Sequence, residues 1–333
     1  MPQGELAQVL RGVTDVANQR LLVGPLTLDD AGVVVFGESE GLPKGVELPI
    51  VQTVDFFPPV VDDPYFYGAI AAANSISDVY AMGGRPVTAL CLAGFPRGFD
   101  REWIAAIMKG GYEKVKESGA ILAGGHTVES EVQFGFSVTG VVERSRLATN
   151  AGAKAGDVVY LTKPLGMGTM TTAAKFQKIT WDQLKPAAIQ MATLNAKAAE
   201  AMNVAGAHAA TDITGFGLAG HGLNIARSSN LCLEIDSALV PIFPGAHALA
   251  KAGNLSGGAK KGKVNIGEHI RSAAGIDATL ELLFFDAETS GGLLIVVDPA
   301  HAAKLEDELA ARDVPVHRIG QFREKTDCFV KFN

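Results

Sequence analysis

One stretch of the sequence constrains the fold more than any other: the run FYGAIAAANSISDVYAM at residues 66–82, in which small and apolar residues dominate. The run is followed by Gly83-Gly84, so it predicts a helix that ends at a glycine C-cap. Its apolar residues cover nearly every side, which indicates a helix buried all round. The rest of the chain must therefore enclose this helix.

Asp78 is a charged residue within that predicted helix, and Asn74 lies one turn earlier on the same face. An ionised carboxylate buried there without a partner would cost on the order of several kcal/mol. Backbone amides or an arginine such as Arg85 could satisfy it, and so could a bound metal ion. The residues alone leave these alternatives open.

Other aspartates share the setting of Asp78, each at the edge of an apolar element, next to Gly or Thr, without a neighbouring base. They are Asp29 and Asp30 in TLDDAG, Asp55 in TVDFF and Asp212 in ATDITGFG. Taken singly, they could form an Asx turn, end a strand and cap a helix, respectively. Taken together, they suit Mg²⁺, which joins protein carboxylates to substrate phosphates. Metal ions would also screen a triphosphate from the acidic residues.

Glycine-rich stretches supply possible anion contacts. In AGGHTVE, Gly124 and Gly125 precede His126, and their backbone amides could approach a phosphate closely, although a lone glycine pair favours a plain tight turn between strands. In TGFGLAGHG, Gly215 and Gly217 stand just before a predicted helix whose N-terminus could face a phosphate. PLGMGTM lacks the complete phosphate-loop patterns and predicts a turn that opens a helix.

The chain of 333 residues is long enough for two domains. A small, polar stretch around residues 149–156 suggests a division into residues 1–152 and 153–333. In the first part, strands are predicted at 47–57, 87–95, 120–129 and 134–143, with helices at 66–82 and 100–118, the second capped by Asp100. In the second part, strands are predicted to start at 158 and 291, with helices at 187–202 and 218–229.

Composition limits the partners and the compartment. The net charge of −7 and the lack of a Lys/Arg cluster argue against nucleic acid and anionic membrane surfaces. No apolar run reaches the roughly 18 residues of a membrane span, and the first residues show no secretion signal. Cys91, Cys232 and Cys328 are too few for a disulfide framework, so a reducing cytoplasm is expected.

The segments TVDFFPPVVDDPYFYGAIAAANSISDVYAMGGRPVTAL, AGGHTVE, TDITGFGLAGH and TSGGLL occur in this order along almost the whole chain. Together they resemble the selenophosphate synthetase (selenide, water dikinase) family of the aminoimidazole-ribonucleotide-synthetase-like superfamily. The glycine turns also occur in thiamine-monophosphate kinase and a hydrogenase-maturation protein of that superfamily, so a related small-molecule kinase is an alternative.

The resemblance implies an α/β N-terminal domain that pairs with its copy in a homodimer to form a β-barrel. It implies a C-terminal α+β sandwich and an ATP site between the two domains. The implied reaction is that of a dikinase, which uses ATP, selenide and water with Mg²⁺ to make selenophosphate, AMP and phosphate.

The resemblance also implies roles for individual residues. The metal ligands would be Asp30, Asp78 and Asp212, with Asn74 supporting Asp78. The nucleotide contacts would be Thr27, Leu28, Asp29, Asp55, Asp78, Gly124, Gly125 and His126, the last three reaching the ATP of the partner subunit.

The family carries a Gly-rich loop with a Cys or selenocysteine, followed shortly by a Lys, just before the segment that matches PQGELAQVL. Here that segment follows Met1 directly, and none of the three cysteines stands where the family has its nucleophile. We expect the nucleophile and the lysine to be encoded upstream, where a selenocysteine codon can be read as a stop. The alternative is a trimmed or degenerate chain that binds nucleotide as a dimer without turnover.

Overall fold

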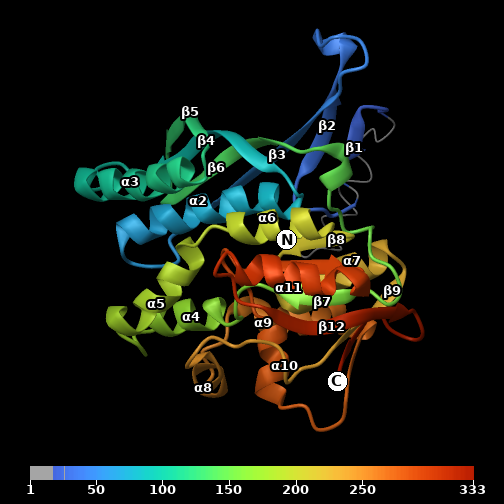
Figure 1. Cartoon of the computed structure of the whole chain (residues 1–333). Helices are drawn as coiled ribbons and strands as arrows, with labels where there is room; N and C mark the ends of the chain where they lie inside the picture. Colours follow the sequence, from blue (N-terminus) through green and yellow to red (C-terminus); the bar gives the residue numbers. More distant parts are fainter. Residues whose placement is uncertain (1–17, 26) are drawn as a thin grey trace.

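The computed structural model describes residues 18–25 and 27–333, which form two β-sheets with helices around and between them (Figure 1). The expectation about the segment after Met1 lies outside the described residues and stays a prediction. Within the described residues, no helix is long and apolar enough to cross a membrane.

The first sheet has six strands in the order β1-β2-β3-β6-β4-β5, and only the β4–β5 pair is parallel. Its edges, β1 and β5, do not pair with each other, so the described part of one chain forms an open sheet and not a barrel. The strands are β1 (Leu21–Val23), β2 (Gly32–Phe36), β3 (Leu48–Phe57), β4 (Arg85–Phe95), β5 (Ile121–Glu129) and β6 (Gln133–Val141).

The predicted buried helix is confirmed as α2 (Pro64–Ala81), in which every residue from Tyr67 to Ala81 is buried. It contacts β3 and β6 on one side and β8 and α5 of the second half on the other, so it lies between the two halves of the chain (Figure 1). Helix α3 (Arg101–Glu117) begins after Asp100, whose side chain accepts from the Glu102 amide, as predicted.

Two glycines allow α2 and α3 to approach closely. A Cβ atom at Gly68 would lie 1.8 Å from the Ile107 carbonyl oxygen, and one at Gly110 would lie 2.0 Å from the Tyr65 carbonyl oxygen. Any larger residue would therefore separate the helices. This packing holds α2 and α3 against each other.

The second sheet has seven strands in the order β10-β13-β9-β12-β7-β11-β8 and is mixed, with β13 parallel to both β10 and β9. The structure thus confirms the prediction that the second half of the chain contains both strands and helices. The strands are β7 (Val158–Leu161), β8 (Ala209–Asp212), β9 (Leu231–Ile235), β10 (Ile270–Ser272), β11 (Leu293–Val297), β12 (His317–Glu324) and β13 (Val330–Phe332). The helices are α4 (Met167–Lys175), α5 (Trp181–Ala192), α6 (Ala196–Ala205), α7 (Gly217–Ser228), α8 (Ala246–Lys251), α9 (Gly257–Ile266), α10 (Ala278–Phe284) and α11 (Ala302–Ala310).

The single helix predicted at 187–202 is wrong, because the structure has α5 and α6 with a break at Thr193–Asn195. At the break, the Thr193 carbonyl accepts from Lys163 Nζ at 2.7 Å, and the Asn195 side chain donates to Ser77 and Gly291. These partners are distant in sequence, so tertiary contacts override the local helical pattern. The division at 152/153 falls between the last strand of the first sheet and β7, and it stays a prediction.

Candidate functional site

The structure brings four of the predicted aspartates together beside α2. Asp55 is near the end of β3, Asp78 is on α2, Asp212 is the last residue of β8, and Asp30 lies just before β2. The charges of Asp55, Asp212 and Asp30 all act on Asp78. We call these four residues the aspartate cluster. Asp212 pairs with Leu293 of β11 and does not cap α7, so the helix-cap alternative is wrong.

Asp78 is buried, with 7% of its surface exposed. Burial raises its pKa well above the ordinary value, and the negative charges of Asp55, Asp212 and Asp30 raise it further. The Thr53 hydroxyl donates to the Asp78 carboxylate. Arg85 is exposed and is not among the groups that shift the pKa, so the arginine alternative is not supported.

Asp212 and Asp55 have neutral hydrogen-bond partners. Burial raises the pKa of Asp212 to about 7, while a hydrogen bond from Ser77 favours its ionised form. Burial also raises the pKa of Asp55 to about 6, and Asn74 Nδ2 donates to Asp55 Oδ2 at 2.7 Å. Each carboxylate is thus oriented by a group that carries no charge.

Asp30 is held by the second half of the chain. Its Oδ1 accepts from Thr211 Oγ1 at 2.7 Å, and burial, followed by the charge of Asp212, raises its pKa well above the ordinary value. Its Oδ2 atom is buried without a partner in the described structure, and so is Asp212 Oδ2. Buried carboxylate oxygens without partners are costly, so these two atoms suit coordination of a cation.

The segment before Asp30 is fixed by Asn150. The Asn150 amide donates to Asp29 Oδ1 at 2.6 Å, and its side chain donates to the Leu28 carbonyl at 2.8 Å. Leu28 has a φ of 55°, a left-handed conformation that is uncommon for this residue type. Thr27 Oγ1 donates to the Gly24 carbonyl at 2.9 Å. These contacts hold Thr27–Asp29 next to the aspartate cluster.

Gly124, Gly125 and His126 do not join the cluster within one chain. They lie inside the edge strand β5, so the tight-turn alternative is wrong, and two strands separate β5 from β3. Across the strands of the first sheet, His126 is paired with Leu92, Leu92 with Gly135, and Gly135 with Phe56. The side chains of His126 and Phe56 therefore point to the same face of the sheet. Asp55 precedes Phe56 and therefore points to the opposite face of the sheet, toward α2.

Sequence reasoning missed Lys163, Ser290 and Asn195. Lys163 is buried, and its Nζ donates to the carbonyls of Thr193 at 2.7 Å and Ser290 at 2.9 Å. Burial lowers its pKa to about 7, although the charge of Asp212 opposes that shift. The only signal for Ser290 was its place in TSGGLL, which supported the resemblance but no role.

The donor chemistry of the cluster fits a divalent cation that is shared with a ligand. Within the described residues, no three His, Cys, Asp or Glu side chains are arranged as a ready metal cage. Mg²⁺ does not need one, because it is usually held by one or two carboxylates together with substrate phosphates and water. The unpartnered oxygens of Asp30 and Asp212 suit that mode of binding.

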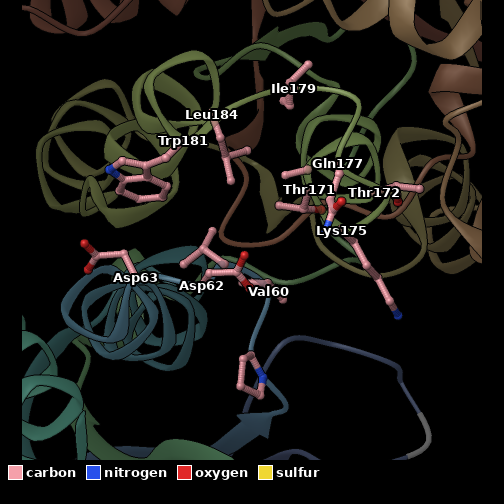
Figure 2. Close-up of a pocket in the computed structure, with 13 residues that line it drawn as sticks. Val60, Asp62, Asp63, Thr171, Thr172, Lys175, Gln177, Ile179, Trp181 and Leu184 are labelled. Carbon is pink, nitrogen blue, oxygen red and sulfur yellow. The ribbon is translucent and has the colours of Figure 1, made fainter. Parts of the chain in front are cut away.

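A cavity of about 700 Å³ lies at the other end of α2. Figure 2 shows Asp62 and Asp63, at the start of α2, on one side and Thr171, Thr172 and Lys175 of α4 on the other. No member of the aspartate cluster lines this cavity. The cavity and the cluster are therefore separate places along the same helix.

Comparison with protein families identifies the class of protein. The model of the AIR synthase related protein N-terminal domain matches residues 28–142, and that of the C-terminal domain matches residues 154–333. Among solved structures, the protein tt0281 from Thermus thermophilus has a TM-score of 0.74 at 20% identity, over 99% of this chain and 96% of that one. The two family models thus show that the chain belongs to the AIR synthase related class, and the solved structure shows the same fold.

Closer relatives narrow the identification. A selenide, water dikinase from Caldanaerobacter subterraneus subsp. tengcongensis is 42% identical over 97% of this chain and 91% of the relative. Selenide, water dikinase 2 from Peptoclostridium acidaminophilum is also 42% identical, over 92% of this chain and 86% of the relative. Within the AIR synthase related class, the chain belongs to the selenide, water dikinase family.

Proposed function

We propose that this chain uses ATP, selenide and water to make selenophosphate, AMP and phosphate, in a reducing cytoplasm. The observation that carries the proposal is the aspartate cluster, in a chain that is 42% identical to a selenide, water dikinase over 97% of its length. Neighbouring carboxylates raise the pKa values of Asp78, Asp30 and Asp212, and burial raises the pKa values of all four. A cation such as Mg²⁺ bound to a triphosphate would stabilise the ionised form of such a cluster. Cys91, Cys232 and Cys328 are free thiols, in keeping with that compartment.

In this proposal, Asp30, Asp78 and Asp212 hold Mg²⁺, while Thr27–Asp29 and Asp55 bind the nucleotide. When bound, Mg²⁺ supplies positive charge that neutralises the phosphate oxygens. The chain itself orients the carboxylates: Thr53, Thr211 and Ser77 donate to Asp78, Asp30 and Asp212, respectively. Positioning of the phosphates by oriented groups is the main protein contribution to phosphoryl transfer.

We also propose a homodimer that forms across the outer face of the first sheet. Val54 and Phe56 of β3 are 55% and 52% exposed, and Leu90 of β4 is 46% exposed. The pairing register places these apolar side chains on one face of the open sheet, together with His126. An exposed apolar sheet face favours cover by a second copy. Gly124, Gly125 and His126 would then contact the nucleotide of the partner, and the two sheets would complete a barrel.

The decisive experiment measures AMP release from Mg-ATP with and without selenide under anaerobic conditions, with ³¹P NMR detection of selenophosphate. Selenide-dependent AMP and selenophosphate support the proposal. Binding of Mg-ATP without AMP release favours the nucleotide-binding alternative. ADP release that depends on thiamine monophosphate favours a related kinase. Asp78→Asn should abolish the activity, whereas Asp307→Asn, an exposed position on α11, should not.

A further inference from the structure

Residues 290–292 form a segment that connects the two halves of the chain, and we call it the strap. It lies just before β11 and is buried, with Ser290 only 1% exposed. Ser290 has a φ of 51°, in the left-handed region that is unfavourable for a serine. Such a conformation persists only where surrounding contacts hold it, and it clusters at functional sites.

One end of the strap contacts the aspartate cluster through Asn74. The Ser290 amide donates to Asn74 Oδ1 at 2.9 Å, and Asn74 Nδ2 donates to Asp55 Oδ2 at 2.7 Å. Because the amide oxygen of Asn74 can only accept and its nitrogen can only donate, these two bonds fix one orientation of the side chain. The strap backbone therefore determines which group Asn74 presents to Asp55.

Lys163 holds the other side of Ser290. Its Nζ donates to the Ser290 carbonyl at 2.9 Å and to the Thr193 carbonyl at 2.7 Å. Both partners are backbone groups, so the hydrogen bonds of the ammonium fix the path of two loops, while its charge acts on Asp212 without a hydrogen bond to that carboxylate. A charged donor makes stronger hydrogen bonds than a neutral one, and burial strengthens them further.

The strap is also linked by hydrogen bonds to Ser77, the hydrogen-bond partner of Asp212. The Gly291 carbonyl accepts from Asn195 Nδ2 at 2.9 Å, and the same nitrogen donates to Ser77 Oγ at 2.8 Å. Ser77 in turn donates to Asp212. One short segment thus adjoins the hydrogen-bond partners of Asp55 and of Asp212, which come from different halves of the chain.

We propose that Lys163 is a positioning residue, which holds Ser290 in its left-handed conformation and thereby, through Asn74, aims Asp55 at the nucleotide. This inference rests on the proposed function, because the orientation of Asp55 matters only when a nucleotide binds. Loss of the Lys163 ammonium should free the strap, let the Asn74 side chain rotate and weaken the grip of Asp55 on its ligand.

The test is a double-mutant cycle, read by isothermal titration with Mg-ATP well below the unfolding temperature. Lys163→Met should bind at least tenfold more weakly than the unchanged protein. Lys304→Met, on the exposed surface of α11, is the matched control and should bind within twofold of it. If Lys163 acts through Asn74, the double variant Lys163→Met/Asn74→Ala should bind no more weakly than Asn74→Ala alone. A purely structural role of Lys163 would not produce this loss of additivity.

Two results would overturn this inference and leave the proposed function intact. The first is a Lys163→Met variant that binds Mg-ATP like the control. The second is a double variant in which the losses of affinity of the two single variants multiply. If thermal unfolding shows that Lys163→Met does not fold, Lys163→Gln takes its place. Glutamine keeps a hydrogen-bond donor but has a shorter side chain without charge, so the same loss of Mg-ATP affinity is expected. Failure of the unchanged protein to bind Mg-ATP would instead overturn the proposed function, and this inference with it.

Discussion

Replacing Asp212 by asparagine should change stability and ligand binding in opposite directions. Asp212 is 1% exposed and shares its surroundings with Asp55, which adds a second negative charge. Asparagine has nearly the same shape and can still accept the hydrogen bond from Ser77. The variant should therefore be more stable than the unchanged protein when ligand is absent, yet it should gain little from Mg-ATP.

The expected gain in stability of the Asp212→Asn variant can be calculated from the raised pKa of Asp212. Burial raises the pKa of Asp212 from 3.8 to about 7, and about 1.4 kcal/mol per unit gives an upper limit of about 4 kcal/mol. The unfolded chain loses this proton near pH 3.8, whereas the folded chain keeps it up to about pH 7. The stability of the unchanged protein therefore falls as pH rises through that window, and the asparagine variant avoids the fall.

The assay is urea unfolding at pH 5 and pH 8 in EDTA, with Asp307→Asn as the exposed control. We expect Asp212→Asn to exceed the unchanged protein by at least about 1 kcal/mol at pH 8, and by less at pH 5. In the same assay with EDTA left out, Mg-ATP at 100 times its Kd should add about 2.7 kcal/mol to the unchanged protein and much less to the variant. A variant that is less stable at pH 8, or a gain that is equal at both pH values, would refute the reasoning.

Further predictions test other parts of the structure. Asp78→Asn should weaken Mg-ATP binding at least tenfold while the fold survives, and unchanged affinity in isothermal titration would argue against a metal role. Phe56→Ser should shift the mass measured by light scattering from dimer toward monomer; a monomeric unchanged protein would contradict the dimer. Gly292→Ala should lower the unfolding free energy by roughly 1–3 kcal/mol, because its Cβ would lie 2.4 Å from the Lys163 backbone nitrogen, whereas Gly267→Ala, with no atom within 4 Å, should be nearly neutral in urea unfolding.

The sequence predicts elements well where the local pattern and the tertiary contacts agree. Helix α2 is surrounded by other elements, so its apolar residues give an unambiguous signal, and Asp100 caps α3 through its own neighbours. The break at Thr193–Asn195 could not be predicted, because Asn195 bonds to Ser77 and Gly291, 118 and 96 residues away. No local pattern encodes such partners.

The site divides in the same way. The aspartates could be found from their residue type and their place at the edges of apolar elements. Lys163 could not, because its partners are backbone carbonyls 30 and 127 residues away, and a carbonyl carries no sequence signature. His126 was predicted from the family resemblance, and one chain places it on the outer face of the sheet, away from the cluster.

The partners of the aspartate cluster indicate why four carboxylates are kept together at a cost in stability. In the described part of the chain, Thr53, Thr211, Ser77 and Asn74 each donate to one of the four, and all of these donors are neutral. A neutral donor orients a carboxylate but does not neutralise its negative charge. Lys163, the cation whose charge acts on Asp212, directs its two hydrogen bonds to carbonyl groups instead. Ion pairs would have stabilised the folded chain and cancelled its affinity for a cation, so the arrangement favours binding over stability.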